Sequence, residues 1–277
     1  MGGAPDILAP PGPAGPIRAH AEAHRLSEPE RARYRRDGFL VRERVFDDAE
    51  LARLSAALDR LQGLAAGVAS TSDITGARFV MDETGPEGAP RIQRVVWAGA
   101  AAPELFEPTL DPRVLTPVLD LLGEDQVDQL VHQVHFKHPG DGVRFGLHQD
   151  AWNRRHGTAL WRGRHPDGDY VQVVLAVDPM SADTGPLRVV AGSHQGGPIL
   201  GLDREARARR RAARRPLQPV VVPAGSLILF GPFLLHASDE NRGRVARRVL
   251  VSGFCRRGVN RRPYPGAGLG VRRSRRP

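Results

Sequence analysis

The sequence predicts a mainly β protein in which helices come first and an antiparallel β-sandwich or barrel follows. Two observations carry this prediction. The clear helix signals lie before Gly123, and from Gln126 onward the hydrophobic period changes to two. The strand-like segments after Gln126 are joined by turns rich in Gly and Pro, with no helix between successive strands, which argues against a parallel α/β sheet.

The N-terminal part is expected to form a leader and then helices. Residues 1–26 are rich in Pro, Gly and Ala and show no periodicity, as is typical of a disordered leader. At Ser27 the sequence Ser-Glu-Pro-Glu predicts a helix N-cap with an acidic first turn, and the segment Glu30–Gly38 leads into a short strand over Phe39–Val41. After Asp47 an amphipathic helix is predicted by four leucines at helical spacing, Leu51, Leu54, Leu58 and Leu61.

The later elements follow from turn and period signals. Residues 70–100 contain several glycines and mixed signals, so we expect a loop there with one strand near Arg91–Trp97. A helix over Pro112–Leu122 should end at Gly123, a typical C-terminal stop. The strands expected after it are Gln129–Lys137, Val143–His148, Asp169–Val177, Leu187–Val190, Leu217–Val222, Ser226–Phe230 and Val245–Phe254.

Length and element order together indicate one domain. At 277 residues the chain can bury a full core, and the sequence shows no internal repeat. We therefore assign residues 28–262 to one domain, between a disordered leader over residues 1–27 and a basic tail over residues 263–277.

Composition limits the class of protein. No apolar stretch approaches the roughly 20 residues that a membrane-spanning helix needs. The N-terminus lacks the basic start and long apolar run of a secretory signal. Cys255 is the only cysteine, so an intramolecular disulfide is excluded. We expect a cytoplasmic protein with a small-molecule substrate and no membrane partner.

The positive charge raises an alternative function. The net charge is +9 and the isoelectric point is about 11.0, values that are also typical of nucleic-acid-binding proteins. However, Lys137 is the only lysine, and the excess of Arg, Ala, Gly and Pro is what a GC-rich genome produces. The basic runs Arg204–Arg215 and Arg272–Arg276 are typical of solvated surface, and aromatic residues make up only 5% of the chain. A nucleic-acid-binding protein, or a nucleic-acid demethylase on a related barrel, is thus the less favoured hypothesis.

A possible metal site lies at the ends of two predicted strands. In the sequence Gly-Leu-His-Gln-Asp, His148 and Asp150 are two residues apart, so strand alternation points both side chains to one face. His236 follows another strand-like segment. Two imidazoles and one carboxylate form the facial set that holds Fe(II) and leaves positions open for reactants. Because the chain has ten histidines, an isolated His-x-Asp pair could equally occur at the surface by chance.

The residues after His236 suggest a site for a dicarboxylate. Ser238 follows His236 by two positions and Arg247 follows it by eleven. Arginine suits the distal carboxylate of such a co-substrate, because its guanidinium donates two parallel hydrogen bonds. In an apolar strand only one of the neighbours Arg247 and Arg248 can face inward, and we expect it to be Arg247. The alternative is a structural ion pair at Arg247 and a turn cap at Ser238.

These motifs together resemble the phytanoyl-CoA dioxygenase family of Fe(II)/2-oxoglutarate-dependent oxygenases. The resemblance covers about residues 30–257 and rests on several motifs in order. They are YRRDGFLV at 34–41, the helix that follows it, His148-Gln149-Asp150, Gly185-Pro186-Leu187 through Ala191-Gly192-Ser193-His194, and His236-Ala237-Ser238 followed by Arg247. The resemblance implies a jelly-roll core, that is, a cupin-like double-stranded β-helix.

The resemblance also implies a reaction. His148, Asp150 and His236 would hold Fe(II), and Arg247 and Ser238 would bind 2-oxoglutarate, which is consumed together with O2. The outcome is oxidation of a substrate C–H bond, as hydroxylation, oxidative cyclisation or desaturation. Relatives that halogenate replace the metal carboxylate with a small residue, so Asp150 argues against halogenation. A tailoring step in antibiotic or other secondary-metabolite biosynthesis is the expected role.

Further site residues are assigned by strand phase and by proximity. His135 stands where several members of the family carry an asparagine that reaches the co-substrate, and Gln133 and Lys137 share its strand face. We assign His135 and Gln133 to 2-oxoglutarate and Lys137 to the substrate, although a satisfied structural histidine would fit equally well. Trp152, beside the metal motif, and Gln172, a polar residue in an apolar strand, are assigned to the substrate with core packing as the alternative for each.

Two long segments suggest mobile loops. Ala151–Gly168 and Gln195–Pro216 are longer than typical hairpin loops and rich in Arg and Gly. We expect Trp152 and Trp161 to cover the cavity, and the run REARARRRAARR to form a short helix over the same opening.

Overall fold

The structure, a computed structural model, describes residues 22–82 and 90–274. Residues 1–21 of the predicted leader lie outside the described residues. The helices are α2 (Glu28–Asp37), α3 (Asp48–Ala65), α4 (Glu107–Leu110), α5 (Pro112–Leu122), α6 (Asp150–Asn153) and α7 (Arg204–Ala212). Within the described residues, none of the helices is long and apolar enough to cross a membrane.

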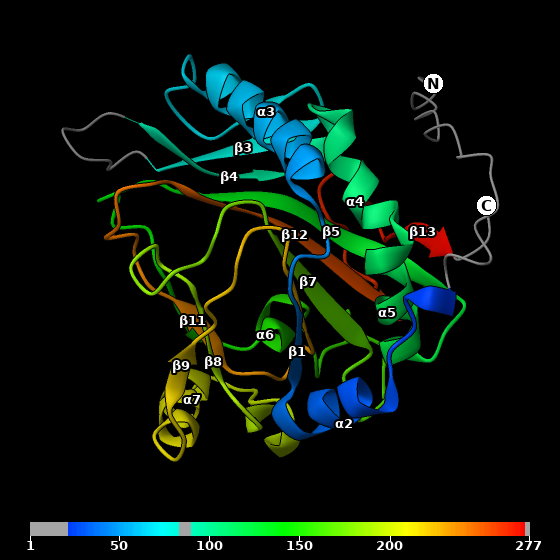
Figure 1. The fold of residues 1–277 in the computed structure, drawn as a ribbon. Helices are drawn as coiled ribbons and strands as arrows, with labels where there is room; N and C mark the ends of the chain where they lie inside the picture. Colours follow the sequence, from blue (N-terminus) through cyan, green and yellow to red (C-terminus); the bar gives the residue numbers. More distant parts are fainter. Residues whose placement is uncertain (1–21, 83–89, 275–277) are drawn as a thin grey trace.

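The strands form two sheets (Figure 1). In chain order they are β1 (Phe39–Arg42), β2 (Ser72–Ile74), β3 (Ala77–Asp82), β4 (Arg91–Val96), β5 (Gln126–Lys137), β6 (Phe145–His148), β7 (Tyr170–Ala176), β8 (Leu187–Val190), β9 (Leu217–Pro219), β10 (Leu227–Phe230), β11 (His236–Ser238), β12 (Arg247–Arg256) and β13 (Val271–Ser274). The large sheet has the order β1-β10-β7-β12-β5-β4-β3-β2, with β13 also paired to β5, and the small sheet has the order β6-β11-β8-β9. The pairs are antiparallel, which confirms the predicted mainly β class with flanking helices.

The two N-terminal helices begin at capping boxes. The side chain of Ser27 accepts a hydrogen bond from the backbone N–H of Glu30, whose carboxylate accepts one from the backbone N–H of Ser27 in return. Asp47 and Glu50 make the same reciprocal pair at the start of α3. Each box satisfies two N–H groups that a helix terminus would otherwise leave unpaired. The predicted helix starts are thus confirmed.

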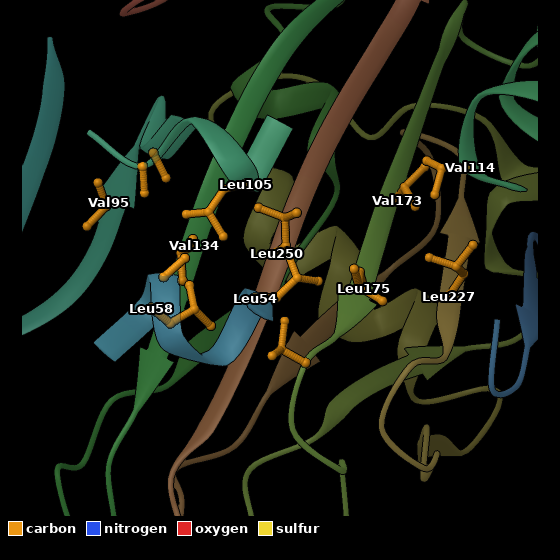
Figure 2. Packing of buried hydrophobic residues seen from close by; sticks show 14 of the residues in the cluster. Leu54, Leu58, Val95, Leu105, Val114, Val134, Val173, Leu175, Leu227 and Leu250 are labelled. Carbon is orange, nitrogen blue, oxygen red and sulfur yellow. The ribbon is translucent and has the colours of Figure 1, made fainter. Parts of the chain in front are cut away.

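Helices α3 and α5 pack on one face of the large sheet (Figure 1). Figure 2 shows the buried side chains of this layer, among them Leu54, Leu58, Val95, Leu105, Val114, Val134, Val173, Leu175, Leu227 and Leu250. Burial of each stabilises the fold by roughly 1.5–3 kcal/mol. On β7, Gln172 and Val174 alternate with Val173 and Leu175 and therefore line the opposite face, where the two sheets enclose a cavity.

Residues 70–100 contain more regular structure than the single strand that we predicted. Strands β2 and β3 form a hairpin, and β3 pairs with β4. The hairpin turns at Thr75 and Gly76, which both have positive φ angles, of 48° and 80°. Two successive residues with positive φ match the twist of the flanking strands, and this turn carries the large sheet out beyond β4.

The C-terminal segment, which we predicted as a basic tail from residue 263, contributes strand β13 to the large sheet. Strand β13 pairs with β5 in antiparallel register, with Val271 opposite Gln129. The amide of Asn260 donates hydrogen bonds to the carbonyls of Arg262 and Leu269, which closes the intervening loop. At the other end, Leu26 is buried although we placed it in the leader. An arginine-rich composition indicated a solvated tail, but strand pairing and Asn260 hold this segment in place.

Candidate metal centre and adjoining cavity

Three side chains of the predicted metal site lie together between the sheets. His148 ends β6, Asp150 begins α6, and His236 begins β11, directly opposite His148 in the antiparallel pair. One ligand atom from each residue lies within 4.8 Å of the others. Nε2 of His148 is 3.9 Å from Oδ1 of Asp150, and the two imidazole rings are 4.1 Å apart between centroids. The structure therefore brings the three residues into the arrangement that the spacing predicted.

The residue between two of the ligands fixes their position. Gln149 is fully buried, and its amide nitrogen donates to the carbonyls of Phe233 and Gly197. Its amide oxygen accepts a hydrogen bond from the backbone N–H of Ile199. Because Gln149 is held on three sides, its neighbours His148 and Asp150 are both turned to the opposite face.

Backbone carbonyls select the tautomer of both histidines. Nδ1 of His148 lies 2.7 Å from the carbonyl oxygen of Gly146, and Nδ1 of His236 lies 3.0 Å from that of Leu234. A carbonyl oxygen can only accept, so each Nδ1 carries the proton and each Nε2 presents a lone pair. This is the usual way in which a protein orients and holds a metal-binding imidazole.

The electrostatics also favour a metal ion. Burial lowers the pKa of His236 to about 4, so its imidazole is neutral and able to coordinate at neutral pH. Burial pushes the pKa of Asp150 upward, but favourable electrostatic interactions with the surrounding side chains, Arg154 among them, outweigh this effect and lower it overall. Two imidazoles and one carboxylate with free donor atoms fit Fe(II).

The triad lies in the wall of a cavity of about 450 Å³. Both sheets contribute to its lining, and large apolar side chains such as Phe145, Phe230 and Met180 make up much of the surface. A cavity of this size holds a small molecule rather than a polymer.

A group of buried cationic and polar residues lies along the same cavity. Arg247 is 4% exposed and donates a hydrogen bond of 2.7 Å from Nη2 to the carbonyl of Gly185, while its Nε has no partner. Lys137 stands opposite Arg247 in the sheet and donates to Ser238 Oγ at 2.8 Å and to the carbonyl of Asp239. Among the described residues, neither cation has a carboxylate within 4.0 Å. A buried cation without an anion is costly, which makes this place suitable for an arriving carboxylate.

Burial acts on the charge of both groups. It lowers the pKa of Arg247 to about 10. It lowers the pKa of Lys137 to about 7, and the charge of Arg247 adds to the effect. An anion placed between them would reverse both changes.

The neighbouring arginine has a different role. Arg248 faces the helical layer, where it binds Asp178 through Nε and Nη2 and Asp59 through Nη1. Arg247 alone of the pair lines the cavity, as we expected from the strand phase.

The polar residues on β5 and β7 also reach the cavity. His135 and Gln133 both line it, and Nε2 of His135 donates to Oε1 of Gln133 at 3.1 Å. Burial lowers the pKa of His135 to about 3, so it is neutral. Gln172 lines the cavity too and accepts a hydrogen bond from the hydroxyl of Tyr170. Their assignments to co-substrate and substrate remain proposals.

Three side chains that we expected in the cavity or over it are not part of its lining. Trp152 is turned away from the cavity, because its indole N–H donates to the carbonyl of Ile199 and its ring lies under Arg204. Trp161 is buried against His156 and Tyr170. Lys137 donates to Ser238 Oγ and is not part of the cavity lining, and its assignment to the substrate remains a proposal.

The predicted helix in the arginine-rich segment exists, but it does not cover the cavity. Helix α7 packs beside β6, and none of its residues lines the cavity. Its Arg211 donates to the carbonyls of Gly196 and Gly197. These contacts attach α7 to the outside of the small sheet, so the sequence-based lid is not supported by this arrangement.

The cavity has lining residues that sequence reasoning missed. Arg78 and Arg94 come from β3 and β4, and Arg154 follows α6. Arg262 is the last residue of the predicted domain, and Tyr264 belongs to the predicted tail. A Thr-Gly pair between two alternating segments was a usable signal for the β2–β3 hairpin. No local signal identifies Arg154 or Tyr264, since their role depends on pairing between distant segments.

Comparison with known proteins extends these observations. The model of the phytanoyl-CoA dioxygenase (PhyH) family matches residues 34–249. L-proline trans-4-hydroxylase of Streptomyces griseoviridis is 25% identical over 150 residues, which cover 45% of this chain and 53% of that protein. The matches span about half the length of the curated relatives.

Two solved structures share the fold. EctD from S. alaskensis with bound Fe has a TM-score of 0.67 and 23% identity, covering 87% of this chain and 80% of the other. The carbocyclase SnoK from nogalamycin biosynthesis, described as non-heme and alpha-ketoglutarate-dependent, has a TM-score of 0.66 and 18% identity, covering 85% of each chain. These likenesses concern the fold alone, and they confirm the predicted jelly-roll core.

Proposed function

Because the chain belongs to the phytanoyl-CoA dioxygenase family, we propose that it is an Fe(II)/2-oxoglutarate-dependent oxygenase that oxidises a C–H bond of a small molecule. His148, Asp150 and His236 would hold the iron, and Arg247 with Ser238 would bind the distal carboxylate of 2-oxoglutarate.

One observation carries this proposal. The metal triad and the buried, carboxylate-free Arg247 line the same cavity of about 450 Å³. A structural metal site would need no unpaired cation nearby, and a structural arginine would need no metal site. The co-substrate requires both at once, because one end coordinates the metal and the other carries a free carboxylate.

The residues of this chain have separable tasks in the proposed reaction. Iron and 2-oxoglutarate, when bound, supply the oxidation of the C–H bond with O2. The carbonyls of Gly146 and Leu234 keep the protons on Nδ1 of the two histidines, so that both Nε2 atoms face the metal. Lys137 orients the hydroxyl of Ser238 toward the co-substrate site by donating to its Oγ. Apolar residues such as Phe230 exclude water from the reacting centre.

The biological role that we propose is a tailoring step in the biosynthesis of an antibiotic or another secondary metabolite. It is supported by the fold shared with SnoK, which is named as a carbocyclase from nogalamycin biosynthesis. Cys255 is buried and carries no disulfide, which is compatible with the reducing cytoplasm that we propose as the location.

The test is metal and co-substrate binding by purified protein. Without O2, we expect one Fe(II) per chain and binding of 2-oxoglutarate that depends on the metal, measured by metal analysis and calorimetry. His236→Ala should weaken Fe(II) binding by more than about 100-fold, since even the loss of an outer-shell partner costs about 10- to 100-fold.

His165→Ala is the matched control, because this histidine is exposed and outside the cavity. It should bind Fe(II) and 2-oxoglutarate like the natural chain. Equal metal binding by the His236→Ala and His165→Ala variants would refute the assigned site.

A further inference from the structure

The lining of the cavity contains far more positive than negative charge. Five guanidinium groups line it, and Asp150 is the only carboxylate among the described lining residues. In the proposed holoenzyme, Asp150 binds the metal and Arg247 binds 2-oxoglutarate. Four cations remain for which this chemistry supplies no anion, and they are Arg78, Arg94, Arg154 and Arg262.

Arg154 is the most constrained of these four. It is 7% exposed, and its guanidinium lies 4.9 Å from the ring centre of Tyr170 and 5.3 Å from that of Tyr264. The backbone N–H of Arg154 donates to the carbonyl of Asp150, so the side chain starts one helical turn from a metal ligand. Its Nε has no hydrogen-bond partner, and no described carboxylate lies within ion-pair distance.

Arg94 approaches the cavity from another wall. It stands on β4 opposite His135 of β5, with its side chain partly buried. Its Nε is also buried without a partner, and it makes no ion pair within the described chain. The other two cations are better satisfied, since Arg78 faces Asp73 at 3.8 Å and Arg262 donates to the carbonyl of Asn153.

We propose that the substrate is an anion, whose carboxylate or phosphate-type group is bound by Arg154, with Arg94 as a second cation in the lining of the same cavity. This inference rests on the proposed oxygenase function, because it assumes that 2-oxoglutarate occupies Arg247. The planar guanidinium can donate two parallel hydrogen bonds to either kind of oxyanion. The rings of Tyr170 and Tyr264 hold the guanidinium of Arg154 in position before the substrate binds.

When Asp150 binds the metal, a neutral substrate would leave Arg154 and Arg94 without an anionic partner of their own. A buried polar group without a partner is costly, and the cost is larger for a charged group. An oxyanion bound near Arg154 would supply an anionic partner for its guanidinium, and the position of Arg154 beside Asp150 would set the distance from the anionic group to the metal.

The test uses three probes of similar size that differ in charge: benzoate, phenylphosphonate and the neutral benzamide. Binding to the full-length protein is measured by calorimetry without O2, in the presence of Fe(II) and saturating 2-oxoglutarate, which keeps the probes from Arg247. We expect at least one anionic probe to bind more tightly than benzamide, and the comparison of benzoate with phenylphosphonate identifies the preferred oxyanion.

Variants assign the binding to the two arginines. Arg154→Gln should weaken the anionic probe by about 10- to 100-fold, the effect of losing hydrogen bonds to a charged group, and leave benzamide unchanged. Arg94→Gln should act in the same direction, and Arg154→Lys should retain part of the affinity because it keeps the charge but not the fork. Arg209→Gln, which removes an exposed charge on α7, is the matched control and should change nothing.

The outcomes separate this inference from the proposed function. If 2-oxoglutarate binds but the anionic probes bind no better than benzamide, the substrate is not an anion and the oxygenase proposal stands. The same conclusion holds if Arg154→Gln and Arg94→Gln keep full affinity, since Arg154 would then only support the tyrosine rings. If 2-oxoglutarate fails to bind while the probes still require Arg154, the anion site stands and the oxygenase proposal fails.

Discussion

Replacement of Arg247 by methionine should have opposite effects on ligand binding and on stability. The buried, charged guanidinium of Arg247 lowers the free energy of unfolding, because burial disfavours its charged form. Burial lowers its pKa to about 10 from an ordinary value above 12. Arg247 is charged in both the folded and the unfolded state at neutral pH, so this cost is present in full there. It disappears only above the ordinary pKa.

The magnitude follows from the pKa and from the contacts of Arg247. A fall of more than two pH units corresponds to about 3 kcal/mol, at about 1.4 kcal/mol for each unit. Arg247→Met also leaves the carbonyl of Gly185 without its partner, which costs about 1–3 kcal/mol. The free energy of unfolding should therefore stay the same or rise by up to about 2 kcal/mol. Binding of 2-oxoglutarate should weaken by roughly 30-fold or more, because a charged hydrogen-bonded pair contributes about 2–5 kcal/mol.

Arg248→Met provides the matched comparison. It removes the two charged hydrogen bonds to Asp178 and the one to Asp59, on the side of the sheet away from the cavity. It should lower the free energy of unfolding by about 1.5–3 kcal/mol and leave 2-oxoglutarate binding unchanged. The assays are denaturant unfolding of the metal-free protein and calorimetry of the Fe(II)-loaded protein. If Arg247→Met is the more destabilising substitution, or if both variants lose affinity equally, the assigned roles are wrong.

Two further substitutions test the interior of the protein. Burial lowers the pKa of Lys137 to about 7 and an arriving dianion favours its charged form, so 2-oxoglutarate affinity should fall as the pH rises above about 7, by up to about tenfold per unit. Lys137→Met should flatten this profile in calorimetric titrations, and a pH-independent affinity of the natural chain would contradict the role of the amine. Gly253→Ala would bring a methyl group against the hydroxyl of the fully buried Tyr170, so we expect a loss of about 1–3 kcal/mol in denaturant unfolding. Unchanged stability of this variant would show that the tyrosine can move.

Local patterns in the sequence were sufficient to predict that His148 and Asp150 share one face and that Arg247 faces the cavity. His148 and Asp150 are neighbours in sequence, and strand alternation alone places them on one face. Alternation likewise separates Arg247 from Arg248, because an apolar strand has only two faces. The capping residues Ser27 and Asp47 were equally informative, since a helix start depends on groups within one turn.

Features that depend on distant segments were missed. Trp152 follows the metal motif directly, yet the carbonyl of Ile199 draws its indole away from the cavity. Strand β13 looked like a solvated tail because its arginines are polar, and only its pairing with β5 explains its order. Arg154 and Tyr264 lie more than a hundred residues apart and meet only in the folded chain. Short-range periodicity contains no information on such contacts.

The position of Arg262 and Tyr264 has a consequence for how specificity can change in this protein. The stretch that matches the family model ends at residue 249, whereas the cavity wall continues through residues 262–265. The residues of the proposed iron and co-substrate sites therefore lie inside the matched stretch, and one part of the cavity wall lies outside it. An exchange of residues 260–274 between relatives would alter selectivity without touching the triad, provided that the new segment preserves the β13 pairing with β5. Grafting this C-terminal piece is thus a direct route to variants with new substrates.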